Sequence, residues 1–105
     1  MRIYYTKKNS FRDFLMGVEF LEEAGKLPKT KDDLEKTHIL VAEIEEMGFE
    51  DAWYLFNCEK NPLIKKQDKF KEWDLGHTSM SIGDIIEDKD GNFRMVNCWG
   101  FTKIF

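Results

Sequence analysis

The chain has 105 residues, a length that supports one domain with a modest hydrophobic core. Its formal net charge of -4 argues against a nucleic-acid binder, because such proteins normally carry a basic excess on one face. The acidic excess lies wholly before Glu59 and forms no long run, so it is too weak to suggest a protein that mimics the charge of DNA.

The N-terminal part predicts a strand followed by a helix. Arg2–Thr6 is short and rich in β-branched and aromatic residues, which is typical of a strand. Apolar residues at helical spacing then predict a helix from Phe11 to Ala24, with most charged residues off the apolar stripe. Gly25 is well placed to end this helix, and Pro28 prevents its continuation.

The middle of the chain predicts a buried strand and a second, shorter helix. Lys26–Lys36 is a polar connector with room for a single helical turn, which Thr30 and Asp33 would cap. His38–Ile44 is largely apolar at both even and odd positions near its start, which indicates a central strand covered on both faces. Apolar residues between Phe49 and Phe56 mark the second helix.

The C-terminal part predicts an irregular segment and a β-hairpin. Asn61–Asp74 is the least regular part of the sequence, and we expect one helical turn at most and the greatest flexibility there. Ile82–Glu87 and Phe93–Trp99 predict two strands joined by a tight turn at Asp90-Gly91, because Asp-Gly between two strand-forming runs favours a hairpin.

Together these elements predict an α+β fold in a single compact domain, residues 1–105. We expect a sheet of three or four strands, mainly antiparallel, with two helices packed on one face. Parallel pairing of the first two strands is the alternative, because a right-handed crossover through the first helix needs a connection of about this length.

The two cysteines favour a cytoplasmic protein. Cys58 and Cys98 lie in apolar surroundings and neither has a CxxC partner. Since the sequence does not open with a signal peptide, we expect two free thiols in a reducing cytosol rather than a disulfide. No apolar run approaches the length of a membrane span, so no membrane association is expected.

The loop before the predicted hairpin carries the residue types of a hydrolytic triad. His77, Ser79, Ser81 and Asp84 fall within this loop, and His38 is the second imidazole of the chain. Residues so close along an extended segment point to opposite faces, so they do not normally converge as nucleophile, base and orienting group. We therefore expect no catalytic residue, and keep a small hydrolase or transferase around His77 and Ser79 as the less favoured alternative.

A structural interpretation accounts for the same residues. The two serines would bond local backbone in a turn, Gly83 would supply a backbone conformation that other residues disfavour, and Asp84 would cap the turn. No spacing of His, Cys and carboxylate residues resembles a metal-ligand set, and the isolated glycines form no phosphate-binding loop. We expect neither a metal nor a cofactor.

A lysine-rich segment offers a nucleic-acid interpretation. Its candidate contacts are Lys65, Lys66, Lys69 and Lys71, interleaved with Phe70 and Trp73, which could stack on bases. Acidic residues nearly cancel this charge, so we favour a solvated loop anchored by its two aromatic residues.

The pattern His77-Thr78-Ser79-Met80-Ser81-Ile82-Gly83-Asp84-Ile85-Ile86, followed by Asp90-Gly91 and Gly100-Phe101, resembles a small family found in bacteriophages and other mobile elements. It is also similar to the YodL-like domain of Firmicute elements. The resemblance covers roughly two-thirds of the chain and is closest in the last third. It implies a phage or mobile-element accessory protein in the bacterial cytosol, and it supplies no catalytic set because the family has no established activity.

The leading functional hypothesis is a non-enzymatic module that binds and modulates a host or phage protein. Its candidate binding residues are His77, Thr78, Ser79, Met80, Ser81 and Trp99. Methionine and tryptophan are residue types that anchor protein interfaces. The alternatives are a nucleic-acid-associated protein that uses the lysine segment, and a homodimer formed through an unpaired edge strand.

Overall fold

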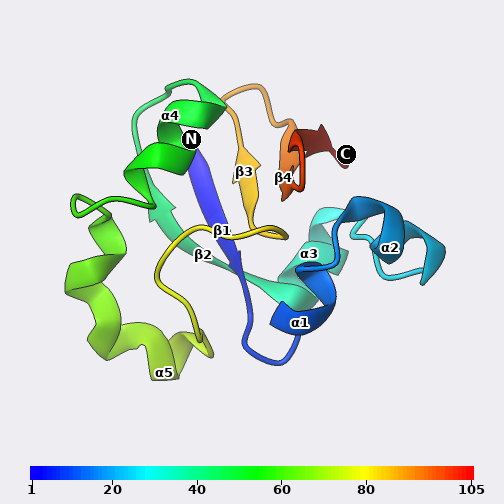
Figure 1. The fold of residues 1–105 in the computed structure, drawn as a ribbon, viewed down its shortest axis with the longest axis horizontal. Helices are drawn as coiled ribbons and strands as arrows, with labels where there is room; N and C mark the ends of the chain where they lie inside the picture. The colour runs from blue at the N-terminus through cyan, green and yellow to red at the C-terminus, as the bar shows by residue number, and fades with distance from the viewer.

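The structure is a computed structural model that describes residues 1–105 (Figure 1). It has an α+β fold built on a five-stranded antiparallel sheet with the strand order β2-β1-β3-β4-β5. The strands are β1 (Arg2–Thr6), β2 (His38–Glu43), β3 (Ile85–Glu87), β4 (Phe93–Asn97) and β5 (Gly100–Lys103). The helices are α1 (Phe11–Phe14), α2 (Val18–Glu23), α3 (Lys31–Thr37), α4 (Phe49–Leu55), the 3-10 helix η1 (Pro62–Lys69) and α5 (Phe70–Trp73). None of these helices has the length and apolar character needed to cross a membrane.

The sheet confirms the fold class and corrects the strand count. Three or four strands were expected, and the fifth is β5, which begins at Gly100 and pairs with β4 after a two-residue turn. Both β3 and β4 are shorter than predicted, since β3 begins only at Ile85 and β4 ends at Asn97. The parallel pairing of the first two strands is wrong, because β1 and β2 run antiparallel.

The helices cover both faces of the sheet, and the prediction of one covered face is therefore wrong. In β1, Ile3 and Tyr5 point into a core cluster with α4 and η1, while Tyr4 points into a second cluster with α1, α2 and α3. Figure 1 shows the two groups of helices on opposite sides of the strands. The alternation of side chains along a strand divides the core in this way, and β1 is buried on both faces.

The predicted helix from Phe11 to Ala24 is divided into α1 and α2. The chain breaks at Gly17, whose φ of 93° lies in the left-handed region, and a Cβ there would lie 2.9 Å from Asn97 Oδ1. The same oxygen accepts a hydrogen bond from Val18 N–H, the first residue of α2. A side chain of β4 thus caps this helix from across the fold. Gly25 follows α2 with a φ of 70°, as its predicted role requires.

Two segments are more helical than predicted. The Thr30 side chain accepts a hydrogen bond from Asp33 N–H, which confirms the expected cap, but α3 extends over seven residues instead of one turn. Asn61 opens η1 by accepting a hydrogen bond from Leu63 N–H. Fully buried Leu34 packs α3 against one core cluster, and fully buried Leu63 packs η1 against the other. This burial stabilises both helices although they contain few apolar residues.

Candidate functional site

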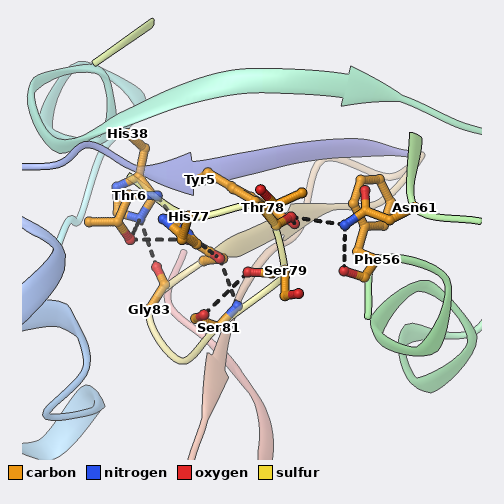
Figure 2. A network of polar contacts seen from close by, with 11 residues as sticks. Tyr5, Thr6, His38, Phe56, Asn61, His77, Thr78, Ser79, Ser81 and Gly83 are labelled. Carbon is orange, nitrogen blue, oxygen red and sulfur yellow. Dashed lines mark hydrogen bonds and ion pairs between the residues drawn. The ribbon is translucent and has the colours of Figure 1, made fainter. Parts of the chain in front are cut away.

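The loop from His77 to Asp84 lies across the end of the sheet and is held by its backbone (Figure 2). The Thr78 carbonyl accepts hydrogen bonds from the Tyr5 hydroxyl at 2.8 Å and from Asn61 Nδ2 at 2.9 Å. Met80 N–H donates to the Phe56 carbonyl, and the Met80 side chain is buried in the core with α4. The loop is therefore fastened to β1, to the end of α4 and to the start of η1.

Asp84 is the centre of a buried polar network. Its fully buried carboxylate accepts hydrogen bonds from Thr6 N–H and Ser81 N–H, both at 2.8 Å, and from the Thr6 hydroxyl at 3.2 Å. His77 Nε2 lies 2.9 Å from the same carboxylate. Asp84 precedes β3, and its Oδ1 takes the Thr6 N–H that a backbone carbonyl would take if the β1–β3 ladder continued. The β1–β3 ladder thus ends at the Asp84 carboxylate, which accepts the hydrogen bonds of Thr6 and Ser81.

His38 joins the network from β2. Its Nε2 lies 2.7 Å from the Gly83 carbonyl and its Nδ1 lies 2.8 Å from the Thr37 hydroxyl. Because a carbonyl can only accept, Nε2 carries the proton and Nδ1 accepts from Thr37. Burial lowers the pKa of His38 from its ordinary 6.5 to about 4, since desolvation penalises the imidazolium. At neutral pH the ring is uncharged and acts as a structural donor.

His77 is packed between two aromatic rings. Its ring stacks on Tyr5 with centroids 4.6 Å apart and lies 4.4 Å from the Phe11 centroid. Nε2 faces Asp84, whereas buried Nδ1 has no hydrogen-bond partner. Neither ring nitrogen contacts a hydroxyl or a thiol, and the Ser81 hydroxyl bonds the Ser79 carbonyl. The arrangement pairs an imidazole with a carboxylate, and the hydroxyl that reaches this carboxylate is that of the fully buried Thr6.

The turn at Gly83 explains why His77 and Asp84 meet. Gly83 has a φ of 97°, and a Cβ at this position would lie 2.6 Å from Phe14 Cβ and 2.9 Å from the Phe14 carbonyl oxygen. The chain therefore does not run extended here, which was the premise for placing the two side chains on opposite faces. Thr6 and Tyr5, which complete the network, lie too far away in the sequence for local spacing to indicate them.

A groove lies beside this loop, between α4 and the β4–β5 turn, and has a volume of about 520 Å³. Glu50 is its only charged lining residue. Its lining residues are Glu50, Trp53, Tyr54, Ile82, Val96, Asn97, Cys98, Gly100 and Phe101. Phe101 packs on Phe49, the first residue of α4, with ring centroids 5.6 Å apart.

Trp99 stands in the turn at the end of this groove and is 99% exposed. Tyr54 on the facing helix is 72% exposed. We call the groove together with Trp99 the hairpin surface.

The remaining predicted binding residues differ in accessibility. Ser79 is exposed, Thr78 and Ser81 are half-buried, and Ile82 connects their loop to the groove. Met80 is 1% exposed and belongs to the core. His77 is largely buried, so these two residues hold the loop in place and do not form part of its outer surface.

The lysine segment is helical and anchored. Lys65, Lys66 and Lys69 lie exposed on η1 and Lys71 on α5, with Lys69 Nζ 5.9 Å from the Trp73 ring centroid. Phe70 and Trp73 pack against the core beside α4. The two aromatic residues thus anchor the segment, as the solvated-segment interpretation requires, although the segment is not a loop.

The structure contains no group of three or more His, Cys, Asp or Glu side chains placed to hold a metal ion. Both cysteines are free thiols. Comparison with models of known protein families, with curated protein sequences and with solved structures found no match to this chain.

Proposed function

We propose that this chain is a non-enzymatic binding module that attaches to another protein through the hairpin surface and modulates it. The full exposure of Trp99 carries the proposal. A tryptophan side chain can bury about 200 Å² in an interface, worth on the order of 5 kcal/mol at about 25 cal/mol per Å². Large contiguous exposed apolar patches mark interaction sites, and Trp99 stands beside an open, mostly apolar groove and the exposed Tyr54.

The surroundings of Trp99 fit a protein partner better than a small ligand. Tyr54 adds exposed area of a type that is enriched at interfaces, and the groove that it lines is open and mostly apolar. Ser79 and Ser81 supply polar groups next to it, as the rim of an interface requires. In this proposal His77 and Asp84 keep the loop in one conformation, so the partner meets a preorganised surface.

The resemblance of the loop to bacteriophage and mobile-element proteins supports a partner encoded by the bacterial host or by the phage. A nucleic-acid partner is less favoured, because the lysine segment carries interleaved acidic residues and its aromatic residues pack against the core.

The test is capture of proteins from bacterial lysate, with and without phage infection, on the immobilised full chain after nuclease treatment. The variant Trp99→Ala with Tyr54→Ala removes the centre of the proposed interface. Lys65→Ala with Lys66→Ala is the matched control, because it also removes two exposed side chains.

We expect one nuclease-resistant partner that is lost with the aromatic variant and retained with the lysine variant. With the purified partner, Trp99→Ala should weaken binding by about 2 kcal/mol, or roughly thirtyfold in the dissociation constant. Retention of the partner by the aromatic variant, or capture that depends on the lysines and disappears with nuclease, would contradict the proposal.

A further inference from the structure

Strand β5 forms one edge of the sheet and has backbone groups without partners. Val96 N–H donates to the Asp84 carbonyl and the Val96 carbonyl accepts from Gly83 N–H, so Val96 faces β3. Phe101 and Lys103 lie opposite Val96 and Arg94, in the pairs that do not exchange hydrogen bonds across β4 and β5. The N–H and C=O groups of Phe101 and Lys103 therefore point outward from the edge.

The two edges of the sheet are protected differently. The β1–β2 register shifts between Ile3 and Tyr4, which pair with Ala42 and Leu40 and leave Val41 as an extra residue in β2. Such a bulge is a common device against strand addition at an edge. In β5, Gly100–Lys103 pair with β4 without a shift, and the bulge on this side follows them, where Phe93 N–H donates to the Phe105 carbonyl and the Phe93 carbonyl accepts from Ile104 N–H. The regular part of the β5 edge is therefore Gly100–Lys103, whereas the bulge in β2 lies inside the strand.

We propose that β5 pairs with β5 of a second copy of this chain, antiparallel about a two-fold axis at Thr102. In this register Phe101 of each copy lies opposite Lys103 of the other, and the outward N–H and C=O groups of both residues are all satisfied. The pairing is self-complementary, as an interface between two identical chains requires. The two sheets then form one continuous ten-stranded sheet, since each copy contributes five strands.

Charge supports a second copy as the occupant. Phe101 packs on α4, and Lys103, two residues further, projects from the same face of the strand. Lys103 of one copy therefore arrives beside Phe101 of the other, next to the groove in which Glu50 is the only charged lining residue. Neither Lys103 nor Glu50 has an ion-pair partner within its own chain.

This inference does not depend on the proposed partner protein, because strand pairing uses the backbone of β5, although Lys103 of the second copy lies next to the groove of the hairpin surface. An interface made by one pair of short strands is small, so we expect a weak dimer. The measurement is therefore the molar mass of the purified full chain by light scattering and sedimentation, over about a hundredfold range of protein concentration. The mass should rise from 12.5 kDa towards twice that value.

Two substitutions of the same residue separate strand pairing from charge. Lys103→Pro removes an outward N–H and leaves the β4–β5 hydrogen bonds intact, because Lys103 N–H does not take part in them. It should raise the dimer dissociation constant more than tenfold. Lys103→Ala keeps the N–H and loses only the charge, so it should raise the constant about two- to fivefold. Should the proline variant fail to fold, Lys103→Glu serves instead, since it places a carboxylate beside Glu50 and should also abolish the dimer.

Amide hydrogen exchange of the wild-type chain gives a direct readout of the register. The N–H groups of Phe101 and Lys103 should exchange fast at low concentration and slowly at high concentration, whereas Thr102 N–H, which faces β4, should be slow in both. A wild-type chain that stays at 12.5 kDa over the whole range overturns the dimer. A dimer that persists in Lys103→Pro, or that leaves Phe101 and Lys103 unprotected, overturns this interface.

The failure of each proposal is distinguishable. Lys103→Pro should be monomeric and still capture the partner protein if both proposals hold. A chain that dimerises as described but captures nothing contradicts only the proposed function, and a monomeric wild type that captures a partner contradicts only the dimer.

Discussion

Acidification from pH 7 to about pH 4.5 should weaken the fold through His38. The pKa of His38 is about 4 in the folded chain and 6.5 ordinarily, so over this range His38 binds a proton in the unfolded chain but not in the folded chain. Stability is therefore complete above pH 6.5 and falls as the pH drops towards 4. At about 1.4 kcal/mol per unit, the loss is about 2.5 kcal/mol at pH 4.5 and approaches about 3.4 kcal/mol well below pH 4.

The assay is urea denaturation followed by tryptophan fluorescence at several pH values between 7 and about 4.5. The control is His38→Gln, whose amide can still donate to the Gly83 carbonyl but does not titrate. The variant should be less stable at pH 7 and should lose less stability on acidification. Carboxylates with a lowered pKa, such as Asp88, lose their stabilising charge only below about pH 4, so their titration does not change the stability between pH 7 and about pH 4.5.

Equal losses of stability in the wild type and in His38→Gln would refute the reasoning. That result would mean that His38 is protonated without cost in the folded chain, and therefore that its ring can leave the Gly83 carbonyl for water. The hydrogen bond at 2.7 Å and the near-complete burial of the ring both argue against such an escape.

Three further substitutions test the loop and the exposed turn by urea denaturation. Gly83→Ala should lower the free energy of unfolding by about 3 kcal/mol or more, because of the positive φ and the overlap of the new Cβ with Phe14. Gly91→Ala has a positive φ but open space around it, so it should cost only about 1 kcal/mol. Equal losses in the two variants would contradict this account. Asp84→Ala should cost about 4 kcal/mol, because it leaves several buried donors unpaired, and a loss below about 1 kcal/mol would show that water replaces the carboxylate. Trp99→Ala should change stability by less than about 0.5 kcal/mol, and a larger loss would show that the side chain packs in solution.

Local patterns in the sequence predicted the elements that depend on neighbouring residues. The strand at Arg2–Thr6, the Thr30 cap and the hairpin around Asp90-Gly91 are all present, because spacing and turn chemistry act within a few residues. The break at Gly17 was missed because its cause, Asn97, lies about 80 residues away in the chain. Periodicity reports which residues are apolar, and it does not report which face of the sheet a helix will cover.

The candidate site divides in the same way. Gly83 was assigned a special backbone conformation from its context, and its φ of 97° agrees. The pairing of His77 with Asp84 was not expected, because the argument assumed an extended chain between them. The exposure of Trp99 could not be predicted, since a tryptophan beside strand-forming residues is more often part of the core.

The hydrogen bonds that Thr6 donates to Asp84 join residues 78 positions apart. Strand β1 is the first element of the chain, yet it lies inside the sheet, and its second neighbour β3 is encoded near the other end. During synthesis the edge of β1 that pairs with β3 therefore stays unpaired until Ile85–Glu87 have left the ribosome. The sheet should consequently assemble only once β3 is available, and the exposed β1 edge is the part of the nascent chain most open to mispairing before then.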